Sequence, residues 1–319
     1  MREIPLALVG PTASGKTEAS LSIAEALDAE IVCIDSMLVY RGMDIGTAKP
    51  TLTQRERVRH HMLDIADPAE TFSVATFQQQ AREALSEIGA RDRRALLVGG
   101  GGLYYRAVVD ALEFPGTMPQ TRALLEAEAV VLGPEAMYTR LVALDPDAAR
   151  KIESGNARRT VRALEVAAIT GKPFSAFARD WDVYPSESVR AAGVDVPRPI
   201  LHRRIEERVQ TMVPGLLEET RRLLDRGFRS FLTSSQAIGY AEAVACLEGG
   251  IGQDEMMAAT IRRAKALARR QMAWFRRDPR IQWFPTEEDG AYGVVDQIMT
   301  YLREGRMGTP ARSVATVEV

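Results

Sequence analysis

The sequence predicts an α/β fold, in which a parallel β-sheet carries helices on both faces. Two observations support this prediction. Short apolar runs alternate with helix-like segments in the first third of the chain, as strands and helices do in parallel sheets. Glycines or an aspartate follow several of these runs, and ligands of such sheets bind beyond the carboxyl ends of the strands. We therefore expect a ligand-binding crevice at that edge of the sheet.

The first strand, loop and helix form the most informative local pattern. An apolar run at 4–9 enters a G-x-x-x-x-G-K-T motif, and a helix-like run at 18–27 leaves it. The motif consists of Gly10, Pro11, Thr12, Ala13, Ser14, Gly15, Lys16 and Thr17. In this context backbone N–H groups close around phosphate, Lys16 adds a positive charge, and Thr17 offers a hydroxyl to Mg²⁺. The sequence thus predicts a phosphate-loop NTPase-like core that binds a di- or triphosphate.

Two further apolar runs predict neighbouring strands. The run at 31–34 ends at Asp35, and the run at 95–98 ends at four glycines, 99–102. We expect both ends to meet the phosphate loop in one crevice, where glycines permit close approach to a ligand. Asp35 can bind magnesium there, act as a general base, or cap the next turn through its side chain. The residues alone do not decide among these three roles of Asp35.

The character of the chain changes near residue 113, where prolines and glycine at 115–119 interrupt the pattern. No strand candidate follows for some 70 residues, which predicts an all-helical insertion domain at 113–187 beside a core of 1–112 and 188–285. The expected helices of the insertion are 122–132, 135–144 and 158–170. In the returning core we expect a strand at 189–196 and helices at about 200–226 and from 253 to 274. Residues 286–319 are expected to form a C-terminal helix and a frayed tail.

Composition excludes several classes of protein. The 319 residues are 46% hydrophobic and 26% charged with a net charge of −2, so any nucleic-acid site must be a local patch. The two cysteines exclude a disulfide framework, and we expect Cys33, inside an apolar strand, to be a core residue. His60 and His61 precede a predicted strand without zinc spacing, which favours packing and hydrogen bonding. No apolar stretch of signal-peptide or membrane length precedes the phosphate loop, so we expect a cytoplasmic protein without a membrane partner.

Basic residues concentrate between 262 and 280, against a single acid, Asp278. The basic members are Arg262, Arg263, Lys265, Arg269, Arg270, Arg276, Arg277 and Arg280. Such a stripe forms either the solvated face of a core helix or a surface that follows a phosphate backbone. Composition alone does not separate these interpretations.

Several segments together resemble one family, the tRNA dimethylallyltransferases. They run in the family's order over about residues 5–285. The segments include GPTASGKT (10–17), DSMLVYRGMDIGTAKP (35–50), LLVGGGGLYYRA (96–107), RRTVRALEVAAITGKP (158–173), LHRRIEERV (201–209), QAIGYAE (236–242) and RRQMAWFRRDPRIQWF (269–284). The phosphate loop is shared with many NTPases, whereas the 35–50, QAIGY and WFRRDPR segments are far more specific.

The resemblance implies transfer of a dimethylallyl group from its diphosphate to the exocyclic amine of the adenosine 3′ of the anticodon, in tRNAs that read U-initial codons. It implies that Asp35, Lys16 and Arg204 are catalytic, that residues 10–17 bind the diphosphate, and that Thr17 holds Mg²⁺. The partners would be dimethylallyl diphosphate and the tRNA anticodon stem-loop, and a monomer suffices. The implied tRNA contacts are Asp35, Ser36, Met37, Leu38, Gly101, Arg122, Arg158, Arg159, Thr160, Val161, Arg162, Arg262 and Arg269.

The chain departs from the family's pattern at the crevice. Gly101 stands where the family usually has a threonine that contacts the diphosphate, and Leu38 stands where it has glutamine. We expect these changes to affect rate and acceptor specificity rather than the fold. Thr76 and Ala157 each replace a common aspartate, and the segment 264–267 lacks the family's threonine and tyrosine.

Two other enzyme classes share the phosphate loop. A prenyltransferase that acts on free adenine nucleotides would also use Asp35, but it would not need the insertion at 113–187 or the basic stripe. A small-molecule or nucleotide kinase would need arginines over the γ-phosphate and commonly an acidic residue where this chain has glycines 99–102. A nucleotide-binding protein without catalysis is the remaining class.

Overall fold

The computed structural model describes residues 4–305. The predicted frayed tail after Pro310 lies outside these residues. The chain forms two compact units, one made of Met1–Val109 with Ser186–Val319 and the other of Asp110–Pro185. The two units are described in turn.

The first unit is built on a parallel sheet, which in residues 4–305 has six strands in the order β3-β2-β4-β1-β5-β6. The strands are β1 (Leu6–Val9), β2 (Ala29–Cys33), β3 (His60–His61), β4 (Arg94–Gly99), β5 (Arg190–Asp195) and β6 (Ile281–Pro285). β1 lies between β4 and β5, and all four of its residues are buried, as expected for an apolar strand covered on both faces. Cys33 is buried at the end of β2, as predicted. The predicted parallel α/β fold is confirmed.

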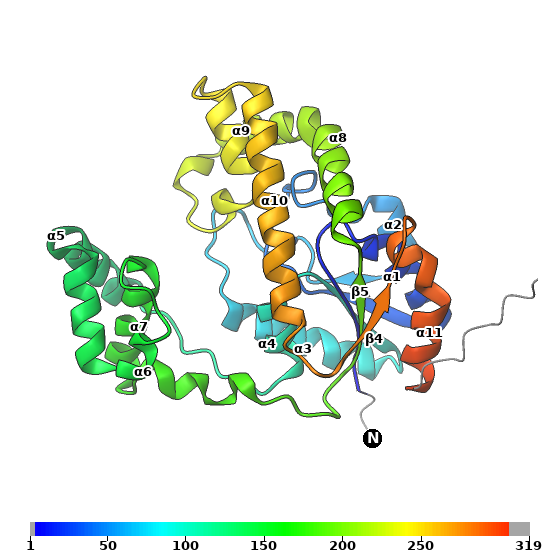
Figure 1. The fold of residues 1–319 in the computed structure, drawn as a ribbon, viewed down its shortest axis with the longest axis horizontal. Coiled ribbons are helices and arrows are strands. Elements are labelled where there is room, and N and C mark those ends of the chain that lie inside the picture. The colour runs from blue at the N-terminus through cyan, green and yellow to red at the C-terminus, as the bar shows by residue number, and fades with distance from the viewer. Residues whose placement is uncertain (1–3, 306–319) are drawn as a thin grey trace, which may run out of the picture. The chain divides into compact units, whose positions relative to one another are not determined.

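Helices cover the sheet on both sides (Figure 1). α1 (Lys16–Leu27) and α11 (Val295–Glu304) pack together on one side, whereas α3 (Val74–Ala90) and α4 (Gly102–Val109) pack together on the other. The remaining helices of this unit are α2 (Leu52–Arg57), α8 (Arg198–Leu224), α9 (Tyr240–Leu247) and α10 (Gln253–Phe275), with short 3₁₀ turns at Phe228–Ser230, Ser234–Gln236 and Gly290–Val294. α8, α9 and α10 pack against one another. None of the described helices is long and apolar enough to cross a membrane.

Two strands differ from the sequence-based expectation. His60 and His61 form β3 themselves, instead of preceding a strand. They serve as hydrogen-bonding groups, because His60 Nδ1 lies 2.7 Å from the Val58 carbonyl and His61 Nε2 lies 2.6 Å from the Glu30 carboxylate. β6 at Ile281–Pro285 was not predicted, because its five residues IQWFP include Gln282 and Pro285 and form no continuous apolar run.

The second unit is helical throughout its described residues. α5 (Pro119–Leu144) is bent at Gly133, which has a φ of 80° and is followed by Pro134, so the two predicted helices 122–132 and 135–144 form one kinked element. α6 (Pro146–Ala149), α7 (Ala157–Thr170) and a 3₁₀ segment (Phe174–Asp182) follow. Asn156 caps α7 by accepting a hydrogen bond from the Arg159 N–H at 3.1 Å. α5 and α7 enclose a small apolar core that includes Met137, Leu141 and Leu164.

Candidate active site

The phosphate loop is closed at its carboxyl end by Gly15, whose φ of 84° is in the left-handed region that favours glycine. α1 begins at the next residue, so its free N–H groups face the loop. The Lys16 ammonium donates hydrogen bonds to the Pro11 carbonyl at 2.6 Å and to Ser14 Oγ at 3.1 Å. The lysine is thus folded over its own loop, where an anion can reach it.

Two arginines of α8 extend this positive site. Arg208 Nη1 donates a hydrogen bond to Thr12 Oγ1 at 3.2 Å, and Arg204 donates one to the Glu288 carbonyl. Both line, with Lys16 and Thr17, a cavity of about 610 Å³ at the phosphate loop. We call it the phosphate cavity. Arg204 was predicted from the sequence but Arg208 was not, although Arg208 lies in the same LHRRIEERV segment.

The cations of this cavity affect one another. Burial and the neighbouring Arg208 guanidinium lower the pKa of the Lys16 ammonium to about 7, while the Asp35 carboxylate opposes this shift. Burial also lowers the pKa of Arg208. Neither Lys16 nor Arg208 forms an ion pair within residues 4–305. Two close cations without a paired anion favour the binding of a strongly negative ligand such as a diphosphate.

The segment that follows β6 supports the phosphate loop from its outer side. The Ala291 N–H donates to the Ser14 carbonyl at 3.0 Å, next to the contact between Arg204 and Glu288. Gly290 has a φ of 58°, and a Cβ atom there would lie 2.1 Å from Arg204 Nη1. Asp289 and Tyr292 line the phosphate cavity. This contact was not predicted from the sequence, because residues after 286 carry no motif.

A second cavity, of about 350 Å³, begins where the first one ends. We call it the apolar cavity, because most of the surface that lines it is apolar. The apolar residues that line it include Met37, Ile205, Val209, Met212, Ala237, Ile238, Ala264, Leu267 and Trp274. The residues that line both cavities are Thr12, Ala13, Asp35, Thr47, Gly100, Arg208 and Gln271. The predicted convergence of the phosphate loop, Asp35 and the glycines 99–102 is therefore confirmed.

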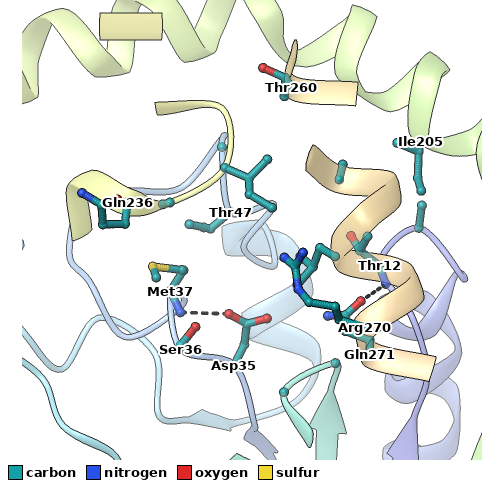
Figure 2. Close-up of a pocket in the computed structure, with 18 of the residues that line it drawn as sticks. Thr12, Asp35, Ser36, Met37, Thr47, Ile205, Gln236, Thr260, Arg270 and Gln271 are labelled. Atoms are coloured by element: carbon teal, nitrogen blue, oxygen red, sulfur yellow. Dashed lines mark hydrogen bonds between the residues drawn. The ribbon is translucent and has the colours of Figure 1, made fainter. Parts of the chain in front are cut away.

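Asp35 follows β2 by two residues and lines both cavities, so it lies at their junction. Figure 2 shows it in the apolar cavity. Its Oδ1 accepts a hydrogen bond from the Met37 N–H at 2.8 Å. This contact caps the turn, and no hydrogen bond to a described residue occupies Oδ2. The capping interpretation and a chemical role are therefore compatible, because one oxygen fixes the carboxylate while the other faces the cavities.

Gln271 is a further junction residue that sequence analysis did not select. It is buried on α10, and its Oε1 accepts a hydrogen bond from the Thr12 N–H at 2.8 Å, so it ties α10 to the phosphate loop. A Cβ atom at Gly100 would lie 2.1 Å from Gln271 Nε2, which explains the glycine there. Its only sequence signal is its place inside the RRQMAWF segment.

The two departures from the family's pattern lie in different cavities. Leu38 lines the phosphate cavity, and Gly101 lines the apolar cavity. A Cβ atom at Gly101 would lie 2.7 Å from the Ile34 carbonyl, closer than van der Waals contact allows. A threonine at 101 therefore requires the backbone around the β2 end or the 99–102 turn to shift.

The basic stripe divides into paired and unpaired members. The ion pairs are Arg263–Glu242, Lys265–Glu206, Arg276–Asp195 and Arg280–Asp278, the last buried. Arg262, Arg269, Arg270 and Arg277 are exposed and form no ion pair with any residue in the described part of the chain. Arg270 reaches from α10 into the apolar cavity (Figure 2). The two interpretations of the stripe thus apply to different residues.

The arginines of the second unit divide in the same way. Arg158 and Arg159 are exposed at the start of α7. Arg122 and Arg162 instead pair with the buried Glu165 at 2.6 and 2.7 Å, which holds the pKa of that carboxyl below its usual range despite its burial. Arg162 also donates hydrogen bonds to the carbonyls of Pro115 (2.6 Å) and Gly116 (3.0 Å). These contacts fix the segment 115–118 to α7.

Two implied tRNA contacts need correction. Thr160 is 0% and Val161 is 4% exposed, and Val161 belongs to the apolar core of this unit. Neither side chain presents a surface to RNA. Spacing along the motif did not reveal this, because neighbouring residues of a helix point in different directions.

The metal ligand implied at Thr17 fits the loop. Its side chain is exposed in the first turn of α1 and lines the phosphate cavity, so its hydroxyl is accessible to a cation that a phosphate also binds. The described residues contain no cluster of three or more His, Cys, Asp or Glu side chains that could hold a metal alone. This donor set suits Mg²⁺, which keeps several waters and takes ligands from substrate phosphates.

These features define the class of protein. It is an α/β phosphate-loop protein in which a cationic cavity and an apolar cavity meet at a carboxylate. Such a site suits a phosphate ester of an apolar group.

The family model described as IPP transferase matches residues 38–278. A tRNA dimethylallyltransferase of Streptomyces griseus subsp. griseus is 50% identical over 280 residues, which cover 87% of this chain and 89% of the relative. One of Kineococcus radiotolerans is 48% identical over 293 residues, or 89% and 92% of the two chains. The chain belongs to the IPP transferase family and is a transferase.

Solved structures agree with this assignment. The tRNA isopentenylpyrophosphate transferase of Bacillus halodurans is 38% identical, with a TM-score of 0.67 over 95% of this chain and 97% of that one. A eukaryotic dimethylallyltransferase described as acting on tRNA shares the fold at a TM-score of 0.80 and 22% identity, over 97% of this chain and 81% of that one. The family resemblance and the fold predicted from the sequence are confirmed.

Proposed function

We propose that this enzyme transfers a dimethylallyl group from dimethylallyl diphosphate to the N6 amine of the adenosine 3′ of the anticodon, in tRNAs that read U-initial codons, and releases diphosphate. The observation that carries this proposal is the junction of a cationic and an apolar cavity at Asp35. A diphosphate ester of a short hydrocarbon needs such an arrangement. The names of the curated relatives support the same reaction.

The donor would place its diphosphate at residues 10–17 and its hydrocarbon in the apolar cavity. Lys16, Arg204 and Arg208 surround the phosphate site. The negative charge of the ligand would raise the pKa of Lys16 from about 7 and keep its ammonium charged. Mg²⁺ bound through Thr17 would add further neutralisation of the diphosphate oxygens.

Transfer breaks the bond between the allylic carbon and the diphosphate oxygen, and its electron pair leaves with the diphosphate. Lys16, Arg208 and the loop N–H groups stabilise the charge that develops there. The N6 amine forms the new C–N bond, and Asp35 accepts the proton that the amine loses. The hydrogen bond from the Met37 N–H at 2.8 Å holds Oδ1, which leaves Oδ2 for that proton.

The acceptor adenosine has to leave the base stack to reach Asp35. Ser36, Met37 and Gly101 line the apolar cavity where it would enter, and Leu38 lies beside them. The exposed Arg262, Arg269 and Arg270 of α10, and Arg277 two residues beyond its end, supply charge for the RNA backbone. We assign backbone contacts to Arg158 and Arg159 of the helical insertion 113–187 as well, and we propose that the enzyme acts as a monomer in the cytoplasm.

Radiolabelled dimethylallyl diphosphate tests this function directly. The labelled donor and Mg²⁺ are incubated with unmodified tRNA whose anticodon reads a U-initial codon, and with AMP and ATP in parallel. We expect label in tRNA alone. Label in AMP or ATP would indicate a free-nucleotide prenyltransferase, and diphosphate binding without any labelled product would contradict the proposed transfer.

A further inference from the structure

Glu219 is a buried carboxylate that the mechanism above does not use. It lies on α8 with 3% of its surface exposed. Its two oxygens accept hydrogen bonds from three consecutive backbone N–H groups, those of Asp44 (2.9 Å), Ile45 (3.1 Å) and Gly46 (3.4 Å). The hydroxyl of Tyr240, at the start of α9, donates a further hydrogen bond to the same carboxylate. A buried carboxylate is stable only when its oxygens are hydrogen-bonded, so loss of one of these donors would weaken the whole group of contacts.

Packing around this carboxylate leaves the loop 44–47 little freedom. Tyr240 is fully buried, and a Cβ atom at Gly46 would lie 2.3 Å from its ring. A Cβ atom at Gly215 on α8 would lie 2.6 Å from Ile45 Cδ1. On the other side of the loop, the buried Lys49 ammonium pairs with Asp44 Oδ1 at 2.9 Å. Backbone and side chains of the loop are therefore held from both sides.

The loop that Glu219 holds forms part of the reaction site. Gly46 and Thr47 line the apolar cavity, and Thr47 lines the phosphate cavity too. Figure 2 shows Thr47 across the apolar cavity from Arg270 and Gln271 of α10, with Asp35 between the two walls. The Thr47 hydroxyl donates a hydrogen bond to the Met43 carbonyl at 2.5 Å, which ties this side chain to its own loop. A shift of the loop would change the width of the junction at Asp35.

We propose that Glu219 is a positioning residue for prenyl transfer: through the N–H groups of residues 44–46 and the Tyr240 hydroxyl, it fixes the wall opposite α10 and thereby the distance across which donor and acceptor meet. This inference rests on the proposed function. Small displacements of reacting groups by distant residues lower the rate of the chemical step more than they lower ground-state binding. The QAIGY and 35–50 segments thus contribute one joint structure to the site.

Glu219→Gln is the informative substitution, because it keeps the size of the side chain but replaces one acceptor oxygen by an NH₂ group that faces N–H donors. We expect the amides of residues 44–46 to exchange hydrogen faster. In single-turnover assays we expect transfer into tRNA to slow by about 10- to 100-fold. Pyrophosphate affinity should change much less, since the cations that hold pyrophosphate, Lys16, Arg204 and Arg208, form no hydrogen bond with Glu219 or with residues 44–46.

Two control substitutions on α8 separate positioning from general loss of stability. Glu218→Gln makes the same chemical change one residue away, at a side chain that is 70% exposed, and should leave exchange and transfer unchanged. Leu223→Ala removes a buried side chain of the same helix and should lower Tm without slowing transfer at a temperature where it is folded. If Glu219→Gln does not fold, Tyr240→Phe keeps the ring against Gly46, removes the hydroxyl that donates to Glu219 and should slow transfer in the same direction.

Wild-type transfer rates in Glu219→Gln would overturn this inference, and so would an equal slowing in Leu223→Ala. Failure of the proposed function has a different signature, since the wild-type enzyme itself would then produce no labelled tRNA.

Discussion

The phosphate cavity and the apolar cavity meet at Asp35, yet the chain assembles them in different ways. The phosphate cavity is organised by one contiguous loop, residues 10–17, to which α8 adds Arg204 and Arg208. The apolar cavity collects single side chains from widely separated segments around residues 37, 101, 209, 237 and 267. A local motif can therefore specify the centre of the charged site, whereas its two arginines from α8 and the whole apolar wall are in place only once the first unit has folded.

Lys16→Met should give the largest effect of the substitutions that probe this difference. It removes a positive charge from the phosphate cavity, so we expect transfer to slow by about 10²- to 10³-fold. Pyrophosphate should also bind more weakly in isothermal titration. Lys172→Met, at an exposed lysine of the second unit, provides the control for charge and should bind pyrophosphate as the wild type does. Wild-type pyrophosphate affinity in Lys16→Met would contradict the role given to this cavity.

The pH dependence of pyrophosphate binding tests the same cavity with a smaller effect. The pKa of Lys16 is about 7 in the free protein, and a bound anion raises it. Above pH 7 the free enzyme therefore loses a proton that binding must restore, which weakens binding by about tenfold per pH unit. Lys16→Arg keeps its charge across this range and should remove that part of the slope. An identical slope in both proteins would show that Lys16 does not titrate there.

The second unit should contribute to tRNA affinity but not to donor binding. We expect Arg158→Ala combined with Arg159→Ala to raise the KM for tRNA about tenfold. The slope of log K against log salt concentration should correspond to about two fewer released counterions. Arg140→Ala changes an arginine of α5 that is 56% exposed and pairs with Glu128, and serves as the control. An unchanged salt dependence in the double variant would remove these two arginines from the RNA surface.

Leu267→Ser should give the smallest effect, confined to the apolar cavity. Loss of apolar contact with the hydrocarbon costs about 1 kcal/mol, so we expect the KM for dimethylallyl diphosphate to rise roughly fivefold. Pyrophosphate lacks the hydrocarbon and should bind as it does to the wild type. Equal weakening of both ligands would mean that the two cavities are not separate in function.

The sequence predicted what depends on local pattern. Apolar runs at residues 4–9 and 95–98 and the glycine spacing of 10–17 are sufficient to predict buried strands and a phosphate loop. What it could not predict depends on partners far along the chain. Glu165 pairs with Arg122, which is 43 residues earlier in the sequence, and Glu219 accepts a hydrogen bond from the N–H of Asp44, 175 residues earlier. Such pairs decide which arginines are available to RNA and which loops are fixed.

The most direct test of the account is single-turnover transfer by Asp35→Asn with enzyme in excess over labelled donor and tRNA. Asparagine keeps an oxygen that can accept the Met37 N–H, so the turn after β2 should be preserved. We predict that transfer slows by about 10²- to 10⁴-fold, as for loss of a general base, while pyrophosphate affinity stays at the wild-type value. Transfer at the wild-type rate would contradict the account, because the proton of the amine would then have another acceptor.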